Sequence, residues 1–392
     1  MMTMFLDSMK KKAAGWVLLL ALAAPGFTLA QSNDNQASQG SQTQQQVPAA
    51  GGPQGDIGPI AVPKKQEEPP PERRTPPAKR EELPNFSLRV DVPLVQVPVM
   101  VLTKNGQFIP GLKKENFKIL EDGNPQQIRQ FSQAEAPITA VLLVEFAANH
   151  YAFMYDALNA SYAFTQMLKP EDWIAVVSYD MRPHIVVDFT QDKRAVLGGL
   201  NSLRIPGFSE TNLFDALYDT IDRIEGIEGR KYIIVIGNGV DTFSRLTYDK
   251  ILKRIQATKD ITLFTISTGF ALRELLDRRF GGRGWAGADM MTFTQADNQM
   301  RTFARMTGGQ FFQPRFEGEL PEIFRAVSAS IRNQYMLAYQ PSNNKQDGSY
   351  RKLKVELMAP DGGPLKIVDE KGKEVKFQIV AREGYRSKFE VE

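Results

Sequence analysis

The stretch ITAVLLVEFAAN, residues 138–149, determines the fold. Its first part, ITAVLLVEF, is an almost unbroken apolar run, which is typical of a strand covered on both faces, as strands in parallel sheets are. Further runs of the same kind follow later in the chain. They are WIAVVSY (173–179), KYIIVIGN (231–238) and ITLFTIST (261–268). These runs predict a mostly parallel central sheet.

Helical patterns lie between these strands. Apolar residues recur at three- and four-residue intervals over residues 153–168, 213–224 and 320–331, which is the spacing of an amphipathic helix. A further helical stretch begins after Asp192, a residue type that caps helix N-termini. Strands alternating with helices predict an α/β, doubly wound domain over residues 136–333, with helices on both faces of the sheet.

Two β-rich segments flank this domain, at residues 86–135 and 334–392. Both show stretches in which apolar and polar residues alternate with a period of two, and Asn105-Gly106 and Asp122-Gly123 are turn signals. Each segment is too small to be stable alone. Pairing of the two into one accessory β domain is one expectation, and two separate additions are the alternative.

The N-terminal region has the pattern of an export signal. Lys10, Lys11 and Lys12 precede an apolar run over residues 13–24, and small residues follow as far as Ala30. This pattern predicts a signal peptide over residues 1–30, either cleaved or retained as an anchor. It implies a periplasmic or secreted protein. No later run is long enough for a transmembrane helix. A Gln-, Ser- and Pro-rich stretch over residues 31–85 has the composition of a disordered linker.

Composition excludes several kinds of site. The chain of 392 residues has no cysteine and a formal net charge of +3, so disulfides, Cys-ligated zinc and iron–sulfur clusters are excluded. Its Lys and Arg residues are spread along the chain, which argues against nucleic-acid binding. An imidazole base would have to be His150 or His184, and no nucleophile-elbow motif is present. A hydrolase is therefore the least favoured function.

Polar residues follow the predicted strands at the edge where they end. Glu145 and Asn149 come at the end of the first run, and Asn238 and Asp241 come after the run at 231–237. Open α/β sheets bind ligands at this carboxyl edge, near the point where the strand order reverses. Oxygen-bearing side chains there are also the ligands that hard divalent cations prefer.

The order of elements resembles the von Willebrand factor A domain. The segments VLLVEFAAN, ETNLFDALYDTI and YIIVIGNGVDTFSRLTYDKI are similar to an exported acidobacterial family related to that domain. The β flanks, LVQVPVMVLTKNGQFIPGLKKENFKILEDG and YRKLKVELMAPDG, resemble the same family, so the resemblance covers about residues 86–386. It implies a metal-ion-dependent adhesion site. The pattern of that site is Asp-x-Ser-x-Ser after the first strand, a later Thr and a final Asp.

The resemblance places Glu145 at the first Asp, Ala147 and Asn149 at the two Ser positions, Thr211 at the Thr and Asn238 at the last Asp. Ala147 offers no oxygen, and Asn238 offers an oxygen without a charge. A degenerate site follows, with no cofactor or at most a weakly bound Mg²⁺ or other divalent cation. The remaining metal ligands would be Glu145, Asn149, Thr211 and Asn238. Hydrogen bonds among these side chains, or to loop backbone, are the favoured alternative.

The sequence therefore predicts a non-catalytic binding module whose partner is a protein in the envelope or outside the cell. A structural scaffold acting through the β flanks is the main alternative. The predicted partner face is the strand-end surface, formed by Glu145, Ala147, Asn149, Thr211, Asn238 and Asp241.

Overall fold

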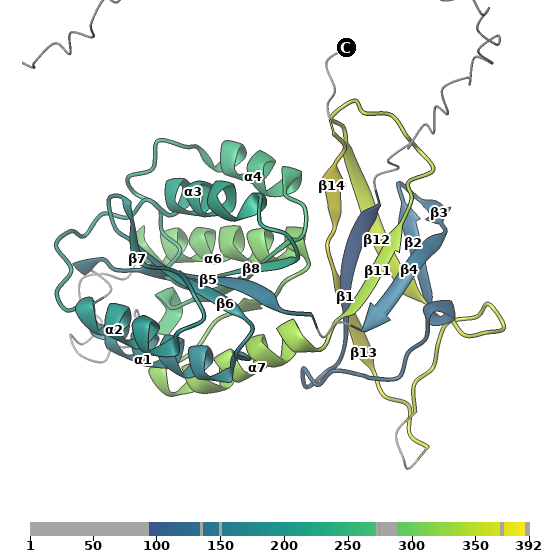
Figure 1. The fold of residues 1–392 in the computed structure, drawn as a ribbon, viewed down its shortest axis with the longest axis horizontal. Helices are drawn as coiled ribbons and strands as arrows, with labels where there is room; N and C mark the ends of the chain where they lie inside the picture. The colour runs from purple at the N-terminus through teal and green to yellow at the C-terminus, as the bar shows by residue number, and fades with distance from the viewer. Residues whose placement is uncertain are drawn as a thin grey trace, which may run out of the picture. The chain divides into compact units, whose positions relative to one another are not determined.

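The computed structural model describes residues 94–133, 136–148, 151–271, 274, 288–368 and 372–388. The predicted signal peptide, the predicted linker, Asn149 and His150 lie outside the described residues. Within these ranges, no helix has the length and apolar character needed to cross a bilayer. The chain forms a central α/β layer structure and a β-sandwich (Figure 1).

The α/β part is built on a six-stranded sheet with the order β10-β9-β8-β5-β6-β7. Neighbouring strands run parallel except at one edge, where β7 runs antiparallel to β6. The prediction of a mostly parallel α/β sheet is therefore confirmed. The strands are β5 (Ile138–Glu145), β6 (Trp173–Tyr179), β7 (Pro183–Thr190), β8 (Arg230–Gly237), β9 (Ile261–Ser267) and β10 (Phe311–Phe312).

Helices cover both faces of this sheet (Figure 1). In β5, Ala140 and Leu142 face one hydrophobic core, while Val141 and Leu143 face the other, so alternation along a fully buried strand serves two helical layers. The first layer holds α1 (Tyr151–Met167), α2 (Lys193–Ser202) and α7 (Leu320–Arg332), and the second holds α3 (Leu213–Glu225), α4 (Tyr248–Ala257) and α6 (Ala288–Thr307).

The two β-rich flanks pair with each other. Strands β1 and β11 are antiparallel neighbours, and so are β2 and β12, although each pair joins opposite ends of the chain. The sheets have the orders β13-β1-β11-β4 and β14-β12-β2-β3. The strands are β1 (Val95–Thr103), β2 (Phe117–Glu121), β3 (Asn124–Gln126), β4 (Ile128–Gln133), β11 (Tyr335–Tyr339), β12 (Tyr350–Leu357), β13 (Phe377–Ala381) and β14 (Gly384–Arg386).

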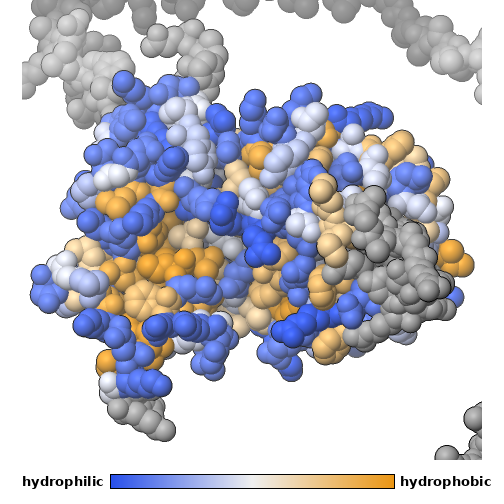
Figure 2. All heavy atoms as spheres, turned by 180° about the vertical axis from the view of Figure 1, so that it is seen from behind, coloured by the Kyte–Doolittle hydropathy of each residue, from blue (hydrophilic) through white to orange (hydrophobic). Residues whose placement is uncertain are grey.

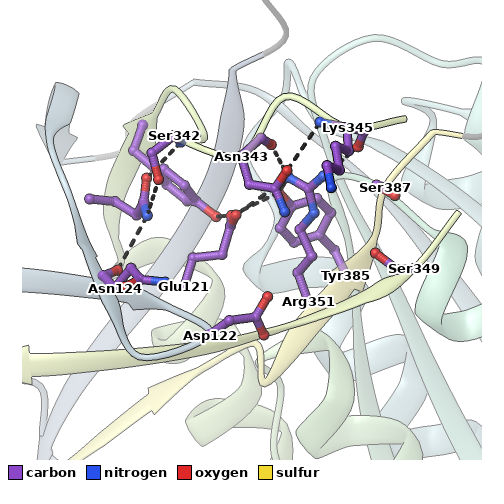
Figure 3. A network of polar contacts seen from close by, with 12 residues as sticks. Glu121, Asp122, Asn124, Ser342, Asn343, Lys345, Ser349, Arg351, Tyr385 and Ser387 are labelled. Atoms are coloured by element: carbon purple, nitrogen blue, oxygen red, sulfur yellow. Dashed lines mark hydrogen bonds and ion pairs between the residues drawn. The ribbon is translucent and has the colours of Figure 1, made fainter. Parts of the chain in front are cut away.

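A buried polar cluster joins the two sheets of the sandwich (Figure 3). Arg351 Nη1 lies 3.4 Å from Glu121 Oε1, and both side chains are almost completely buried. The Tyr385 hydroxyl donates to Glu121 Oε2 at 2.8 Å, and the Tyr339 hydroxyl donates to the same oxygen. A buried carboxylate requires such partners because its desolvation is otherwise unfavourable. The cluster thus ties β2, β11, β12 and β14 together.

Candidate functional site

The candidate site lies where the strand order of the parallel sheet reverses. From β5 the chain goes to β6 on one side, and it later returns to β8 on the other side. Because β5, β6 and β8 are parallel, their carboxyl ends meet at one edge. Glu145 is the last residue of β5, and Asn238 immediately follows β8. The topology therefore brings together two residues that are far apart in sequence.

Glu145 and Asn238 form a closed hydrogen-bonded pair. The Asn238 backbone N–H donates to Glu145 Oε2 and its side-chain amide donates to Oε1, each at 2.6 Å. The Glu145 side chain is buried, and burial raises its pKa to about 8, although the Asn238 backbone N–H opposes this shift. A carboxyl group with this pKa is mostly protonated at neutral pH. The acid at this position therefore contributes little negative charge to the edge of the sheet.

Gly237 and Tyr179 complete the enclosure of Glu145. A Cβ atom at Gly237 would lie 2.5 Å from both Glu145 Oε2 and the Tyr179 hydroxyl, so only glycine fits between them. Burial and the nearby Glu145 raise the pKa of Tyr179 well above its ordinary value. Neither residue was predicted to belong to the site. The sequence signal for Gly237 was a glycine at the end of a strand whose other side chains are mostly large and apolar.

Thr211 holds two loops of the edge together. Its backbone N–H donates to Thr242 Oγ1 at 2.9 Å, and its hydroxyl donates to the Val240 carbonyl oxygen at 2.5 Å. The bond to Val240 joins the Thr211 side chain to loop backbone, which is the arrangement favoured above over a role as a metal ligand. Thr211 is buried. It links the segment before α3 to the loop after β8.

Asp241 caps a helix. Its Oδ2 atom accepts from the Phe214 backbone N–H at 2.8 Å and from the Ser244 hydroxyl at 2.6 Å. Phe214 lies in the first turn of α3, where backbone N–H groups lack intrahelical partners. Burial raises the pKa of Asp241, while these hydrogen bonds lower it. The carboxylate of Asp241 is therefore committed to the start of α3.

Ala147 and Asp180 lie on the same edge. Ala147 is completely buried and offers no side-chain oxygen. Asp180 follows β6, accepts from the Arg182 backbone N–H at 3.2 Å, and lies 3.5 Å from the His184 ring. The described part of the chain has no group of three or more His, Cys, Asp or Glu side chains arranged to hold a metal ion.

The described side chains Glu145 and Asn238 are not arranged to bind Mg²⁺. Both oxygens of Glu145 accept hydrogen bonds from Asn238, and the side-chain oxygen of Asn238 accepts from the Val240 N–H at 2.7 Å. Magnesium requires near-ideal octahedral coordination by oxygen ligands. Binding an ion here would mean breaking these hydrogen bonds and ionising a carboxyl group whose pKa burial has raised.

No family model matches the chain, and no curated protein matches it. Solved structures similar to it include the von Willebrand factor domain of the type V pili tip protein Mfa5 from Porphyromonas gingivalis, with 14% identity, 50% of this chain and 96% of that chain covered, and a TM-score of 0.37. The conserved hypothetical protein BatB from Bacteroides thetaiotaomicron is 13% identical to this chain. The match covers 50% of this chain and 100% of that chain, with a TM-score of 0.38. A von Willebrand factor type A structure from Catenulispora acidiphila has 12% identity, with 76% of each chain covered and a TM-score of 0.39. These similarities assign no residue roles to this chain.

Proposed function

We propose that this chain is an exported, non-catalytic protein-binding module that contacts its partner at the carboxyl edge of the parallel sheet without a metal ion. The pairing of Glu145 with Asn238 carries this proposal. The carboxyl group that an adhesion site would present to an ion is buried and hydrogen-bonded within the protein. Recognition at this edge would therefore use the side chains around the pair.

Two exposed aromatic side chains lie on loops of the same edge. Phe208 is 46% exposed and Phe243 is 49% exposed. The Phe208 carbonyl accepts from the Ala148 N–H at 2.7 Å, and the Phe243 N–H donates to the Thr211 carbonyl at 2.8 Å. Both aromatic residues are thus attached by their backbones to the loops of the site. Aromatic side chains held in this way suit the centre of a protein interface.

Exposed apolar side chains alone do not identify a site. The face in Figure 2 shows hydrophobic patches, in orange, separated by hydrophilic residues, in blue. Isolated exposed hydrophobic residues are normal in soluble proteins. Phe208 and Phe243 differ because they lie on loops that meet at the point of strand-order reversal, where open α/β sheets bind ligands.

Export and membership of the acidobacterial family are part of the same proposal. Lys10–Lys12 followed by the apolar run at 13–24 supports export. The resemblance of residues 86–386 to that family supports membership. The partner would then be a protein of the envelope or the cell exterior.

The test compares capture from envelope extract by the wild-type chain and two variants. The Phe208→Ser/Phe243→Ser double variant should lose the captured protein, because the interface loses its aromatic contacts. A Trp173→Ser variant should retain it, because Trp173 is 44% exposed but starts β6, at the opposite edge of the sheet. Capture should persist in EDTA.

Two outcomes would contradict the proposal. Equal capture by the double variant and the wild type would show that the partner binds a different face. That result would favour the scaffold alternative, in which the β-sandwich makes the contacts. Capture that disappears in EDTA and returns with Mg²⁺ would show that the edge works through an ion after all. Circular dichroism of each variant establishes that it is folded.

A further inference from the structure

A cavity of about 310 Å³ lies beside the buried polar cluster of the sandwich. Its walls come from the start of β1, the turn between α4 and β9, the loop between β11 and β12, and the region around β14. Lys259 and Asp260, in the α4–β9 turn, immediately precede β9. The cavity therefore lies toward the amino ends of the parallel strands, at the opposite edge from Glu145 and Asn238. Its volume is that of a site for a small molecule.

The walls of the cavity carry an excess of positive charge. Among the described residues that line it, Asp260 is the one acidic residue. Glu121, behind the wall, pairs with Arg351. The Asp347 carboxylate accepts a hydrogen bond from Ser387 in the wall, so over the described residues six basic side chains lie near three carboxylates. The basic lining residues are Lys259, Lys345, Arg351, Arg382, Arg386 and Lys388.

The arginines of the cavity are held in place largely by neutral groups. Arg382 is 5% exposed; its Nη2 donates to the Thr258 carbonyl at 2.8 Å and its Nε to the Gly384 carbonyl at 3.2 Å. Arg386 Nε donates to the Gln256 side chain at 3.2 Å. Over the described ranges, no carboxylate lies within ion-pair distance of Arg382 or Arg386. These contacts position the guanidinium groups but leave their charge unbalanced.

A further observation indicates that an anion would be favourable here. The pKa of Lys259 is lowered, first by burial and then by the charge of Lys388. A lowered lysine pKa means that the charged form is disfavoured where it stands, so a bound anion would relieve this repulsion.

The cavity also has an apolar wall. Leu94, Val95 and Pro341 line it together with Tyr385, whose side chain lies beside Arg351 in Figure 3. A bare inorganic ion would use only the basic side chains. A ligand with a compact apolar body and an anionic head group would contact both kinds of wall, which is the usual chemistry of a small-molecule site.

We propose that this cavity binds a small organic anion, with its carboxylate or phosphate head group at the cluster of Lys and Arg side chains and its apolar body against Leu94, Val95 and Pro341. The site is separate from the partner face at the carboxyl edge of the sheet. A test of ligand binding at this cavity can therefore succeed or fail without bearing on the proposed protein-binding function.

Isothermal titration calorimetry with phenyl phosphate, benzoate, inorganic phosphate and benzyl alcohol tests this proposal. Phenyl phosphate or benzoate should bind more tightly than inorganic phosphate, and neutral benzyl alcohol should not bind. Which aromatic anion binds more tightly distinguishes a phosphate site from a carboxylate site. Added NaCl should weaken binding, because the attraction is electrostatic.

Three variants locate the site. Lys259→Gln/Lys388→Gln removes two lysine charges from the cavity wall and should weaken binding roughly tenfold or more, since hydrogen bonds to charged groups are the strong ones. Asp260→Asn should strengthen binding several-fold, and asparagine tolerates the left-handed backbone of this residue (φ 52°). Lys104→Gln, in the exposed turn after β1, should bind as the wild type does.

The gain in Asp260→Asn separates a charge effect from damage to the fold, because a merely structural disturbance would not tighten binding. Three results would overturn the proposal. They are failure of both aromatic anions to bind at millimolar concentration, unchanged affinity in the Lys259→Gln/Lys388→Gln variant, and binding of inorganic phosphate as tight as that of phenyl phosphate and benzoate.

Discussion

The protonation of Glu145 predicts how the stability of the folded chain depends on pH. Its pKa is about 8 in the folded protein, against an ordinary value of 4.5. Between these values the folded state holds a proton that the unfolded state has released. The free energy of unfolding therefore falls as pH rises through this interval. The contribution is fully present below the ordinary pKa and is lost once the pH passes the folded-state pKa.

The size of this effect follows from the shift. One pKa unit corresponds to roughly 1.4 kcal/mol, so the loss amounts to about 5 kcal/mol over the whole interval and about 2–3 kcal/mol between pH 5 and pH 7. Such a loss is a large part of the stability of an ordinary domain. Glu145→Gln removes the titrating group. The amide group of the new glutamine places its own N–H donors against the N–H donors of Asn238. This mismatch should lower the free energy of unfolding of the variant by a similar amount at every pH.

Urea unfolding followed by circular dichroism, from about pH 5 to about pH 8.5, measures the difference between the two proteins. The free energy of unfolding of the wild type should fall relative to that of Glu145→Gln as pH rises. An Asp188→Asn variant is the control, because Asp188 is exposed and has a lowered pKa, so it should keep the wild-type slope in this range. If the wild type and Glu145→Gln give parallel curves, Glu145 is ionised in the folded state and the account of the site is wrong.

Other contacts give further predictions. Gly237→Ala should destabilise the fold by about 1–3 kcal/mol in urea unfolding, because its methyl group would overlap a buried carboxyl oxygen, whereas Gly226→Ala, with open space around it, should change little. Arg351→Met should cost about 3–5 kcal/mol by leaving the Glu121 carboxylate without its ion pair. Adding Glu121→Gln to that variant should recover part of the loss, and a fully additive loss would argue against the pair. Millimolar Mg²⁺ should leave the melting temperature of the wild type unchanged, and a rise would indicate a bound ion.

Much of the α/β part could be predicted because its signals are local. The apolar run at 138–146 forms a strand buried on both faces. When helical patterns alternate with apolar runs of this length, the runs usually form the strands of a parallel sheet. Asp192 was identified as the start of a helix, and its side chain does accept a hydrogen bond from the Arg194 N–H. HIVVDF (184–189) was predicted to be a strand, but the antiparallel direction of β7 was not, because direction depends on a short turn and not on composition.

The sandwich and the interior of the site depended on pairings between distant residues. The sequence pattern of residues 377–386 is that of a single strand. The structure divides it into β13 and β14, which belong to different sheets. Position in the sequence placed Glu145 and Asn238 at the same edge, since both end parallel strands. It could not show that the two side chains bond to each other, because that depends on the rotamers and on the space left by Gly237.

Two of the four departures from the adhesion-site pattern, Glu145 and Asn238, can be explained together. With an aspartate at position 238, two carboxyl groups would lie at the 2.6 Å separation now seen between Glu145 and the Asn238 amide, and without an ion one of them would have to take up a proton. Asparagine adds a side-chain N–H donor to the backbone N–H that any residue but proline supplies at that place, and the Glu145 carboxyl group accepts from both. The hydrogen bonds of Asn238 thus replace the coordination that an ion would give. Under the proposed function, the edge would keep its shape without a metal, and Phe208 and Phe243 would be the groups best placed to meet a partner.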